Sequence, residues 1–200
     1  MKIGILGGTF NPIHTGHLIL AENAYTVLGL DKVIFMPSGV SYLKDRKEIA
    51  AKEHRINMVR LAIKDNDRFE LSTMETDREG NTYTFETLNA LKTQNTKDEL
   101  YFIGGTDTLM NIENWKCPDI IFKNASLVIA PRNFTVSNII NDKAEYLQKK
   151  YDAKVIILDT PNIEISSSMI RHKIANGKSV RYYIPDDVIG YINDNKLYKE

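Results

Sequence analysis

Apolar residues along the chain fall into two alternating kinds of segment. Short continuous apolar runs, typical of buried β-strands, lie at residues 3–6, 33–36, 100–103, 127–130 and 155–158. Longer segments between them carry apolar residues at helical spacing, as where Leu18, Ala21 and Tyr25 share one face. Further helices are expected at 55–63 and 139–147.

This alternation predicts an α/β fold with a Rossmann-like, doubly wound sheet of about five mostly parallel strands. Parallel neighbours need long right-handed crossovers, so helices are expected on both faces of the sheet. The chain has 200 residues and no linker rich in Pro, Gly or Ser. We therefore expect residues 1–200 to form a single domain.

A first candidate site follows the first predicted strand, where open parallel sheets bind their ligands. Residues 7–17 read GGTFNPIHTGH and lead into a predicted helix. The pattern is neither the dinucleotide G-x-G-x-x-G nor a Walker P-loop. Its glycines let the backbone approach a phosphate, and Gly16 leaves the first helical turn open, where free N–H groups favour an anion.

Two histidines, His14 and His17, lie three residues apart across the start of this helix. They could donate hydrogen bonds to phosphate oxygens without adding a permanent charge. A metal site or a purely structural role remains an alternative for the pair. The metal alternative is disfavoured because no Cys, Glu or third His lies at ligand spacing to complete a zinc shell.

A second candidate site follows the last predicted strand, at residues 165–171, which read ISSSMIR. Ser166 can cap a helix there, and Arg171 lies one turn into it, suited to gripping two phosphate oxygens. Alone, the segment could be a plain helix cap with a surface arginine. Two phosphate cradles after different strands predict a polyphosphate such as ATP between them.

Charge and cysteine content narrow the functional class. Lys and Arg number 26 and Asp and Glu also number 26, so no overall field draws the protein to nucleic acid or an anionic membrane. No apolar run approaches the roughly 18 residues of a membrane span, and the N-terminus lacks a signal-peptide pattern. We therefore expect a cytoplasmic protein, with the single Cys117 as a half-buried small apolar residue.

The two clusters resemble the motifs of the nucleotidyltransferase superfamily, an (H/T)-x-G-H turn at residues 14–17 and an I-S-S-(S/T)-x-x-R helix at 165–171. Within it the chain most resembles the bacterial nicotinate-nucleotide adenylyltransferases over nearly its whole length. The further matching segments are residues 7–18, 82–84, 87–88, 105–107, Trp115, 184–188, 191–192 and 197–198.

The resemblance implies that nicotinate mononucleotide and ATP are converted to deamido-NAD and pyrophosphate. Mg²⁺ would ride on the ATP phosphates, and no protein metal ligand is assigned. The mononucleotide phosphate is already a competent nucleophile at neutral pH, so neither a covalent intermediate nor a general base is needed. The oligomeric state stays open, with a homo-oligomer as one possibility.

The resemblance also assigns roles to individual residues. Those expected to stabilise charge on the reacting phosphates are His14, His17, Lys44 and Arg171. Those expected to bind ATP or line the dinucleotide are Gly8, Thr9, Phe10, Gly105, Asp107, Ile165, Ser166 and Ser167. Those expected at the pyridine nucleotide are Tyr83, Thr84, Trp115 and Arg132. The indole of Trp115 would stack on the ring, although a lone tryptophan could equally be a packing anchor.

The chain departs from the family pattern at two places. Arg132 is followed by Asn-Phe where the family usually has Pro-Gly, and residues 41–44 read SYLK where it commonly has Pro-Pro-His-Lys. Lys44 keeps its register, and the charged segment 44–53 is either a mobile loop closing over ATP or a solvated turn. His54 and His172 are interpreted as structural.

Three other functions fit parts of the sequence. An adenylyltransferase acting on nicotinamide mononucleotide or phosphopantetheine shares the motifs, but the phosphopantetheine enzymes are usually shorter and lack Trp115. A non-catalytic nucleotide-binding regulator is disfavoured by the intact His14, His17 and Arg171. A truncated aminoacyl-tRNA synthetase core is disfavoured because neither a tRNA-binding domain nor a basic face is evident.

Overall fold

The computed structural model describes residues 1–39, 49–131, 137–161 and 163–199. Within them lies a sheet of six strands, every neighbouring pair of which is parallel. The strands are β1 (Lys2–Gly8), β2 (Lys32–Pro37), β3 (Phe69–Leu71), β4 (Glu99–Gly105), β5 (Ala125–Ala130) and β6 (Val155–Ile157). The predicted doubly wound α/β fold is confirmed.

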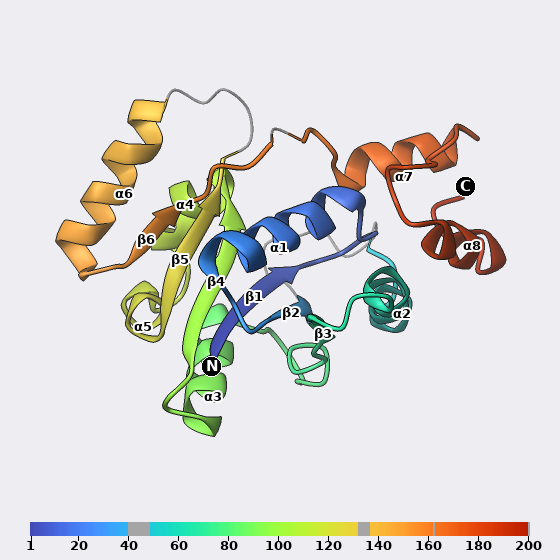
Figure 1. Ribbon diagram of the computed structural model, residues 1–200. Helices are drawn as coiled ribbons and strands as arrows, with labels where there is room; N and C mark the ends of the chain where they lie inside the picture. Colours follow the sequence, from blue (N-terminus) through green and yellow to red (C-terminus); the bar gives the residue numbers. More distant parts are fainter. Residues whose placement is uncertain (40–48, 132–136, 162, 200) are drawn as a thin grey trace.

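The strand order β3-β2-β1-β4-β5-β6 reverses direction at the centre of the sheet. The chain moves outward from β1 to β3, returns to place β4 beside β1, and then moves outward on the other side (Figure 1). Leu6 of β1 pairs with Phe35 on one neighbour and Ile103 on the other. The carboxyl ends of β1 and β4 therefore form the switch point where such sheets bind ligands.

Helices cover both faces of the sheet (Figure 1). Those that pack on one face are α1 (Thr15–Leu28), α2 (Lys52–Ile63), α7 (Ser167–Ala175) and α8 (Asp186–Asp194). Those on the other are α3 (Thr84–Gln94), α4 (Thr106–Asn111), the 3₁₀ turn η2 (Ile112–Asn114), α5 (Pro118–Asn124) and α6 (Ser137–Tyr151). In the described ranges, no helix is both long and apolar enough to cross a membrane.

Alternate side chains of the central strands fill two separate cores. Leu6 packs with Ala21 of α1 in one, whereas Ile5 packs with Leu88 of α3 in the other. Neighbouring residues on a strand point to opposite faces, so a strand covered on both sides must be apolar at every position. Each fully buried aliphatic side chain stabilises the fold by about 1.5–3 kcal/mol. This explains the continuous apolar runs.

One element differs from the sequence prediction of about five strands. The sixth strand is β3, a three-residue strand at the edge of the sheet beside β2. Phe69 and Leu71 are only half-buried, and Glu70 between them is exposed, so the apolar signal is too short to recognise. The helices expected at 55–63 and 139–147 lie inside α2 and α6, and Cys117 is half-buried as predicted.

Candidate active site

The two histidines of the first motif stack at the start of α1. His14 is the N-cap of the helix and only 2% exposed, and its ring centroid lies 3.6 Å from that of His17, with 23° between the planes. The backbone N–H of His14 donates to Nδ1 of His17 at 3.2 Å. Because Nδ1 is an acceptor, a neutral His17 carries its proton on Nε2. Nε2 is then a hydrogen-bond donor.

Two glycines make room for the rings around these histidines. A Cβ on Gly16 would lie 3.1 Å from Nδ1 of His14, and one on Gly8 would lie 3.2 Å from the ring of Phe10. Phe10 in turn meets His17 edge-on, with ring centroids 5.0 Å apart. The glycines thus allow close ring packing, besides the close approach to phosphate that the sequence predicts.

The second motif touches the first directly. Ser166 caps α7 by accepting the Met169 N–H at 3.2 Å, as predicted. Ser167 Oγ donates to the Pro12 carbonyl at 2.8 Å, and Arg171 Nη1 donates to the Asn11 carbonyl at 3.0 Å, across 155 and 160 sequence positions. The start of α7 therefore contacts the loop that leads into α1, so the two motifs lie side by side.

Ile165 and Arg171 are the first and last residues of the second motif. Ile165 is half-buried and packs against the core cluster that contains Ala21 of α1, which seats the start of α7 against the sheet. Besides bonding to Asn11, Arg171 approaches Ser168, with 3.4 Å between Nη2 and Oγ. These contacts orient the guanidinium along the loop that leads to His14.

A buried arginine beneath this site was missed by the sequence analysis. Arg55 of α2 is 4% exposed, and its Nη1 donates to the carbonyls of Thr9 and Ser38 at 2.9 Å each. Its Nε donates to the carbonyl of Ala50 at 3.1 Å. Burial lowers the pKa of the guanidinium, while Tyr198 and Glu53 act in the opposite direction. Arg55 ties together the loops that follow β1 and β2.

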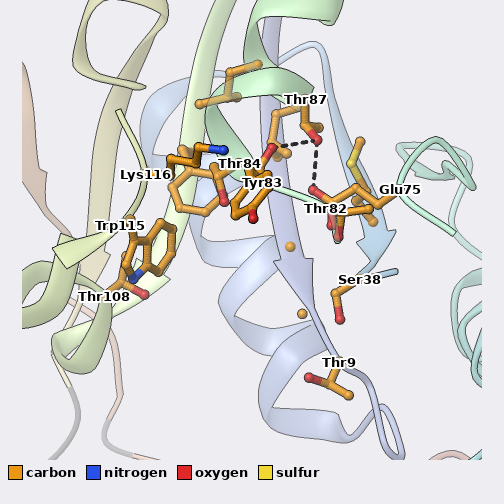
Figure 2. A pocket seen from close by; sticks show the side chains of 16 residues that line it. Thr9, Ser38, Glu75, Thr82, Tyr83, Thr84, Thr87, Thr108, Trp115 and Lys116 are labelled. Atoms are coloured by element: carbon orange, nitrogen blue, oxygen red, sulfur yellow. Dashed lines mark hydrogen bonds between the residues drawn. The ribbon is translucent and has the colours of Figure 1, made fainter. Parts of the chain in front are cut away.

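A cavity of about 280 Å³ lies beside these loops, at the carboxyl ends of β1 and β2 (Figure 2). Five of the predicted site residues line it: Gly8, Thr9, Tyr83, Thr84 and Trp115. Lining residues that were not predicted as site residues include Ser38, Glu75, Thr82, Thr87, Thr108 and Lys116. The volume is at the lower end of the range for small-molecule pockets, roughly 300–1,000 Å³.

An aromatic and basic wall closes one side of the cavity. Trp115 packs edge-on against Phe102 of β4, with ring centroids 5.9 Å apart. The ammonium of Lys116 lies 4.3 Å from the centre of the Tyr83 ring, and Figure 2 shows both beside Trp115. Tyr83 is the N-cap of α3, which begins at Thr84. A flat apolar ring and an anionic group fit such a wall.

The opposite side of the cavity holds a half-buried carboxylate network. Thr87 Oγ1 donates to Glu75 Oε1 at 2.9 Å, and Arg78 Nη1 donates to the same hydroxyl at 3.1 Å (Figure 2 shows the former bond). Burial raises the pKa of Glu75, while the bonds from Thr87 and Gly39 and the charge of Arg78 oppose the rise. The network fixes the end of β2 against the start of α3.

Comparisons with known proteins agree with this geometry. Residues 5–173 match the model of the cytidylyltransferase-like family. A "Probable nicotinate-nucleotide adenylyltransferase" of Lachnoclostridium phytofermentans is 43% identical over 98% of both chains, and one of Dehalococcoides mccartyi (strain CBDB1) is 45% identical over 99% of this chain and 97% of its own. The chain belongs to the nicotinate-nucleotide adenylyltransferase family. The predicted resemblance is confirmed.

The fold of this family member is also that of a solved structure. Plasmodium falciparum nicotinic acid mononucleotide adenylyltransferase complexed with NaAD superimposes with a TM-score of 0.82 at 21% identity, covering 98% of this chain and 97% of that one. The same Plasmodium protein complexed with APC gives a TM-score of 0.78 at 22% identity, covering 98% and 96%. At these identities the likeness concerns the fold.

The remaining predicted residues of this adenylyltransferase family member divide into two groups. Gly105 is the N-cap of α4, and Asp107 lies exposed in its first turn, at the carboxyl end of β4. Lys44 and Arg132 lie outside the described residues, so the structure does not place them. Among the residues it does describe, no cluster of three or more His, Cys, Asp or Glu side chains could hold a metal ion.

The two histidines interpreted as structural bond to residues outside the two motifs. His54 of α2 bonds through Nδ1 to the Tyr191 hydroxyl of α8 at 3.0 Å. His172 is exposed on α7, where its carbonyl accepts the Asn176 side chain at 2.7 Å. Of the charged segment 44–53, the last two residues already belong to α2.

The segment that carries Trp115 is anchored by a carboxylate. Glu113 of η2 bonds to Lys143, to Lys150 at 2.8 Å and to the Tyr151 hydroxyl at 3.1 Å, all on α6. The bonds to Lys143 and then Lys150 lower the pKa of Glu113 to about 2. A carboxyl group whose pKa falls on folding stabilises the folded state above its ordinary pKa and loses that contribution as the pH falls.

We expect Glu113→Gln to lower the Tm by about 2–5 °C at pH 7. The difference from the unmodified protein should shrink as the pH falls from 4.5 toward 2, because over that range the Glu113 carboxyl takes up a proton in the unfolded chain and stays ionised in the folded protein, which favours unfolding. Thermal melts at several pH values measure both effects. A Tm difference that does not change with pH would contradict the proposed ionic anchor, and Glu145→Gln, an exposed pair partner of Lys149, is the matched control.

Proposed function

We propose that the protein transfers the AMP part of ATP to the phosphate of nicotinate mononucleotide, forming deamido-NAD and pyrophosphate. One observation carries the proposal: the starts of α1 and α7 are joined through Ser167 and Arg171, and the turn at Gly8–Thr9 links them to the cavity walled by Trp115. The helix starts would bind the triphosphate of ATP, which donates the adenylyl group. The adjoining cavity would bind the flat pyridine ring of the acceptor.

The phosphate site would act by hydrogen bonding and charge. ATP enters as its Mg²⁺ complex, with the ion carried on the phosphate oxygens. Nε2 of His17 is a donor because its Nδ1 accepts the His14 N–H, and the N-terminal amides of α7 favour the same anion. Arg171 supplies a fixed charge, and Lys44 and Arg132 are proposed as further phosphate ligands. Asp107 is proposed to bind the ribose region.

The cavity would hold the pyridine ring of the acceptor. The indole of Trp115 offers a flat stacking surface, and the start of α3 at Tyr83–Thr84 presents N–H groups to a carboxylate. Lys116 adds a positive charge on the same wall, 4.3 Å from the Tyr83 ring centre. A carboxylate gains from both features, which favours nicotinate over nicotinamide mononucleotide.

The proposed reaction is a single in-line displacement. An oxygen of the mononucleotide phosphate attacks the α-phosphorus of ATP, and the bond from that phosphorus to the oxygen bridging to the β-phosphate breaks. Pyrophosphate is the leaving group. The acceptor oxygen is already ionised, so the protein contributes alignment and stabilisation of the charge that develops on the leaving group.

A kinetic assay with a panel of acceptors tests this function. The purified protein, with MgATP, is given nicotinate mononucleotide, nicotinamide mononucleotide or phosphopantetheine, and pyrophosphate release and the product are measured. We expect the highest kcat/KM with nicotinate mononucleotide, and deamido-NAD as its product. A higher value with phosphopantetheine, or ATP binding without pyrophosphate release from any acceptor, would reject the proposal in favour of another transferase or a regulator.

Some features of the protein remain predictions alongside this function. A single domain spanning residues 1–200 and a cytoplasmic location both suit an enzyme acting on small soluble nucleotides. Whether the protein forms a homo-oligomer is a separate question that size-exclusion chromatography with light scattering would answer.

A further inference from the structure

The end of the chain reaches the phosphate site. Tyr198 is half-buried, and its hydroxyl donates to Oδ1 of Asn11 at 2.8 Å, across 187 sequence positions. Its φ of 61° lies in the left-handed region, which a non-glycine residue adopts when surrounding contacts hold it there. Asn11 belongs to the loop between β1 and α1 that carries the histidines. The C-terminal residues therefore bond to the loop of the first motif.

Asn11 is a junction between this contact and Arg171. Its side chain is 4% exposed, and Oδ1 accepts both the Tyr198 hydroxyl and the Ala50 N–H, the latter at 3.0 Å. Its main-chain carbonyl accepts Nη1 of Arg171 at 3.0 Å. Two bonds on the side chain and one on the carbonyl fix the residue in orientation. A shift of its side chain would move the carbonyl that orients the arginine.

The hydroxyl of Tyr198 stays protonated and can therefore donate its hydrogen bond to Asn11 at any physiological pH. Burial raises its pKa, while the positive charges of Arg171 and Arg55 act in the opposite direction. Because the pKa is raised, the group keeps its proton and can donate to Asn11 across the physiological pH range. A change of pH within this range would therefore not break the hydrogen bond between Tyr198 and Asn11.

We propose that Tyr198 is a positioning residue of the phosphate site, whose hydroxyl fixes Asn11 and through it directs the guanidinium of Arg171 at the ATP phosphates. The inference rests on the proposed adenylyl transfer. It assigns the C-terminal segment a part in catalysis, through the bond path Tyr198–Asn11–Arg171. A merely structural tail would affect stability and leave turnover unchanged.

Replacing Tyr198 with phenylalanine removes the hydroxyl and keeps the ring. We expect kcat to fall about tenfold, since small misplacements of a transition-state ligand are costly. The KM for nicotinate mononucleotide should stay within about twofold, because Tyr198, Asn11 and Arg171 are not among the residues that line the proposed pyridine cavity. Steady-state kinetics with each substrate varied separately measures both values.

Tyr191→Phe is the matched control. The Tyr191 hydroxyl bonds to His54 and to Asn57, at 3.0 Å each, and so ties α8 to α2 without contacting Asn11 or Arg171. We expect this variant to lower the Tm and leave kcat within about twofold of wild type, because two partly buried hydrogen bonds are lost away from the reacting groups. All kinetics are measured well below the lowest Tm.

A double-mutant cycle tests whether Tyr198 acts through Asn11. In the Asn11→Ala background the hydroxyl has lost this acceptor, so adding Tyr198→Phe should lower kcat no further. A wild-type kcat in Tyr198→Phe, or an equal fall in both backgrounds, would overturn the inference. An inactive wild-type protein would instead reject the proposed function, so the two failures are distinguishable in one experiment.

Discussion

Replacing His17 with alanine is expected to lower kcat by about 100–1000-fold, the effect of losing one preorganised donor to a developing charge. The His17 ring lies between His14, with ring centroids 3.6 Å apart, and Phe10, which it meets at a steep angle. Its Nδ1 is occupied by a backbone N–H, which leaves the proton on Nε2. Turnover with MgATP and nicotinate mononucleotide, followed by pyrophosphate release, measures the loss.

His172→Ala serves as the control for this substitution. It removes the same side chain from an exposed position on α7, and we expect its kcat to stay within about twofold of wild type, as for most surface substitutions. If His17→Ala retained a kcat within about threefold of wild type, the assigned donor role would be wrong.

Arg171→Ala is expected to give a loss of similar size, about 100–1000-fold in kcat. The guanidinium donates to the Asn11 carbonyl through Nη1 and approaches Ser168 through Nη2, which aims it along the line where the two helix starts meet. Arg171→Lys should recover part of the activity and remain about tenfold slower than wild type, because an ammonium keeps the charge and lacks the planar fork. The kcat values of the wild type, Arg171→Ala and Arg171→Lys, measured at saturating concentrations of both substrates, test this order.

Arg68→Ala is the charge-matched control for Arg171. Arg68 pairs with Glu22 at 3.6 Å and lies over the Tyr25 ring at the surface, next to the start of β3. It lies at the opposite end of the strands from the candidate site. We expect its loss to leave kcat unchanged, so equal effects of the two alanine variants would show that Arg171 acts only through net charge.

The central sheet was predictable because burial on both faces imposes a pattern on the sequence. In β2, Val33 and Phe35 fill one core and Ile34 and Met36 the other, so four consecutive positions are apolar. An edge strand has no such requirement. In β3, Phe69 and Leu71 remain half-buried around an exposed Glu70, and three residues carry too little periodicity to predict a strand.

The arrangement of the two motifs was predictable to the extent that it depends on local sequence. A helix cap at Ser166 and a ring pair at His14 and His17 follow from residue type and spacing, and strands of one parallel sheet bring their following loops to the same edge. The supporting contacts are tertiary. Arg55 binds main-chain carbonyls, which any residue could provide, so no pattern in the sequence marks its partners.

The cavity that Trp115 lines was likewise only partly predictable from the sequence. Trp115 was assigned by resemblance, but Lys116 beside it belongs to an exposed, irregular segment whose direction depends on the packing of η2 against α6. Glu75 lies in the irregular segment between β3 and α3, and it meets Thr87 of α3, twelve positions later, only because of the path that this segment takes. Side chains such as these can be assigned to the cavity only when the path of the backbone is known.

A crystal structure with Mg²⁺ and a non-hydrolysable ATP analogue tests the central claim most directly. We expect the triphosphate to lie between the starts of α1 and α7, with phosphate oxygens about 2.7–3.2 Å from Nε2 of His17, from Arg171 and from the first amides of α7. A triphosphate bound elsewhere, with the histidine pair and the serine-rich turn both more than a hydrogen-bond length from any phosphate oxygen, would contradict it.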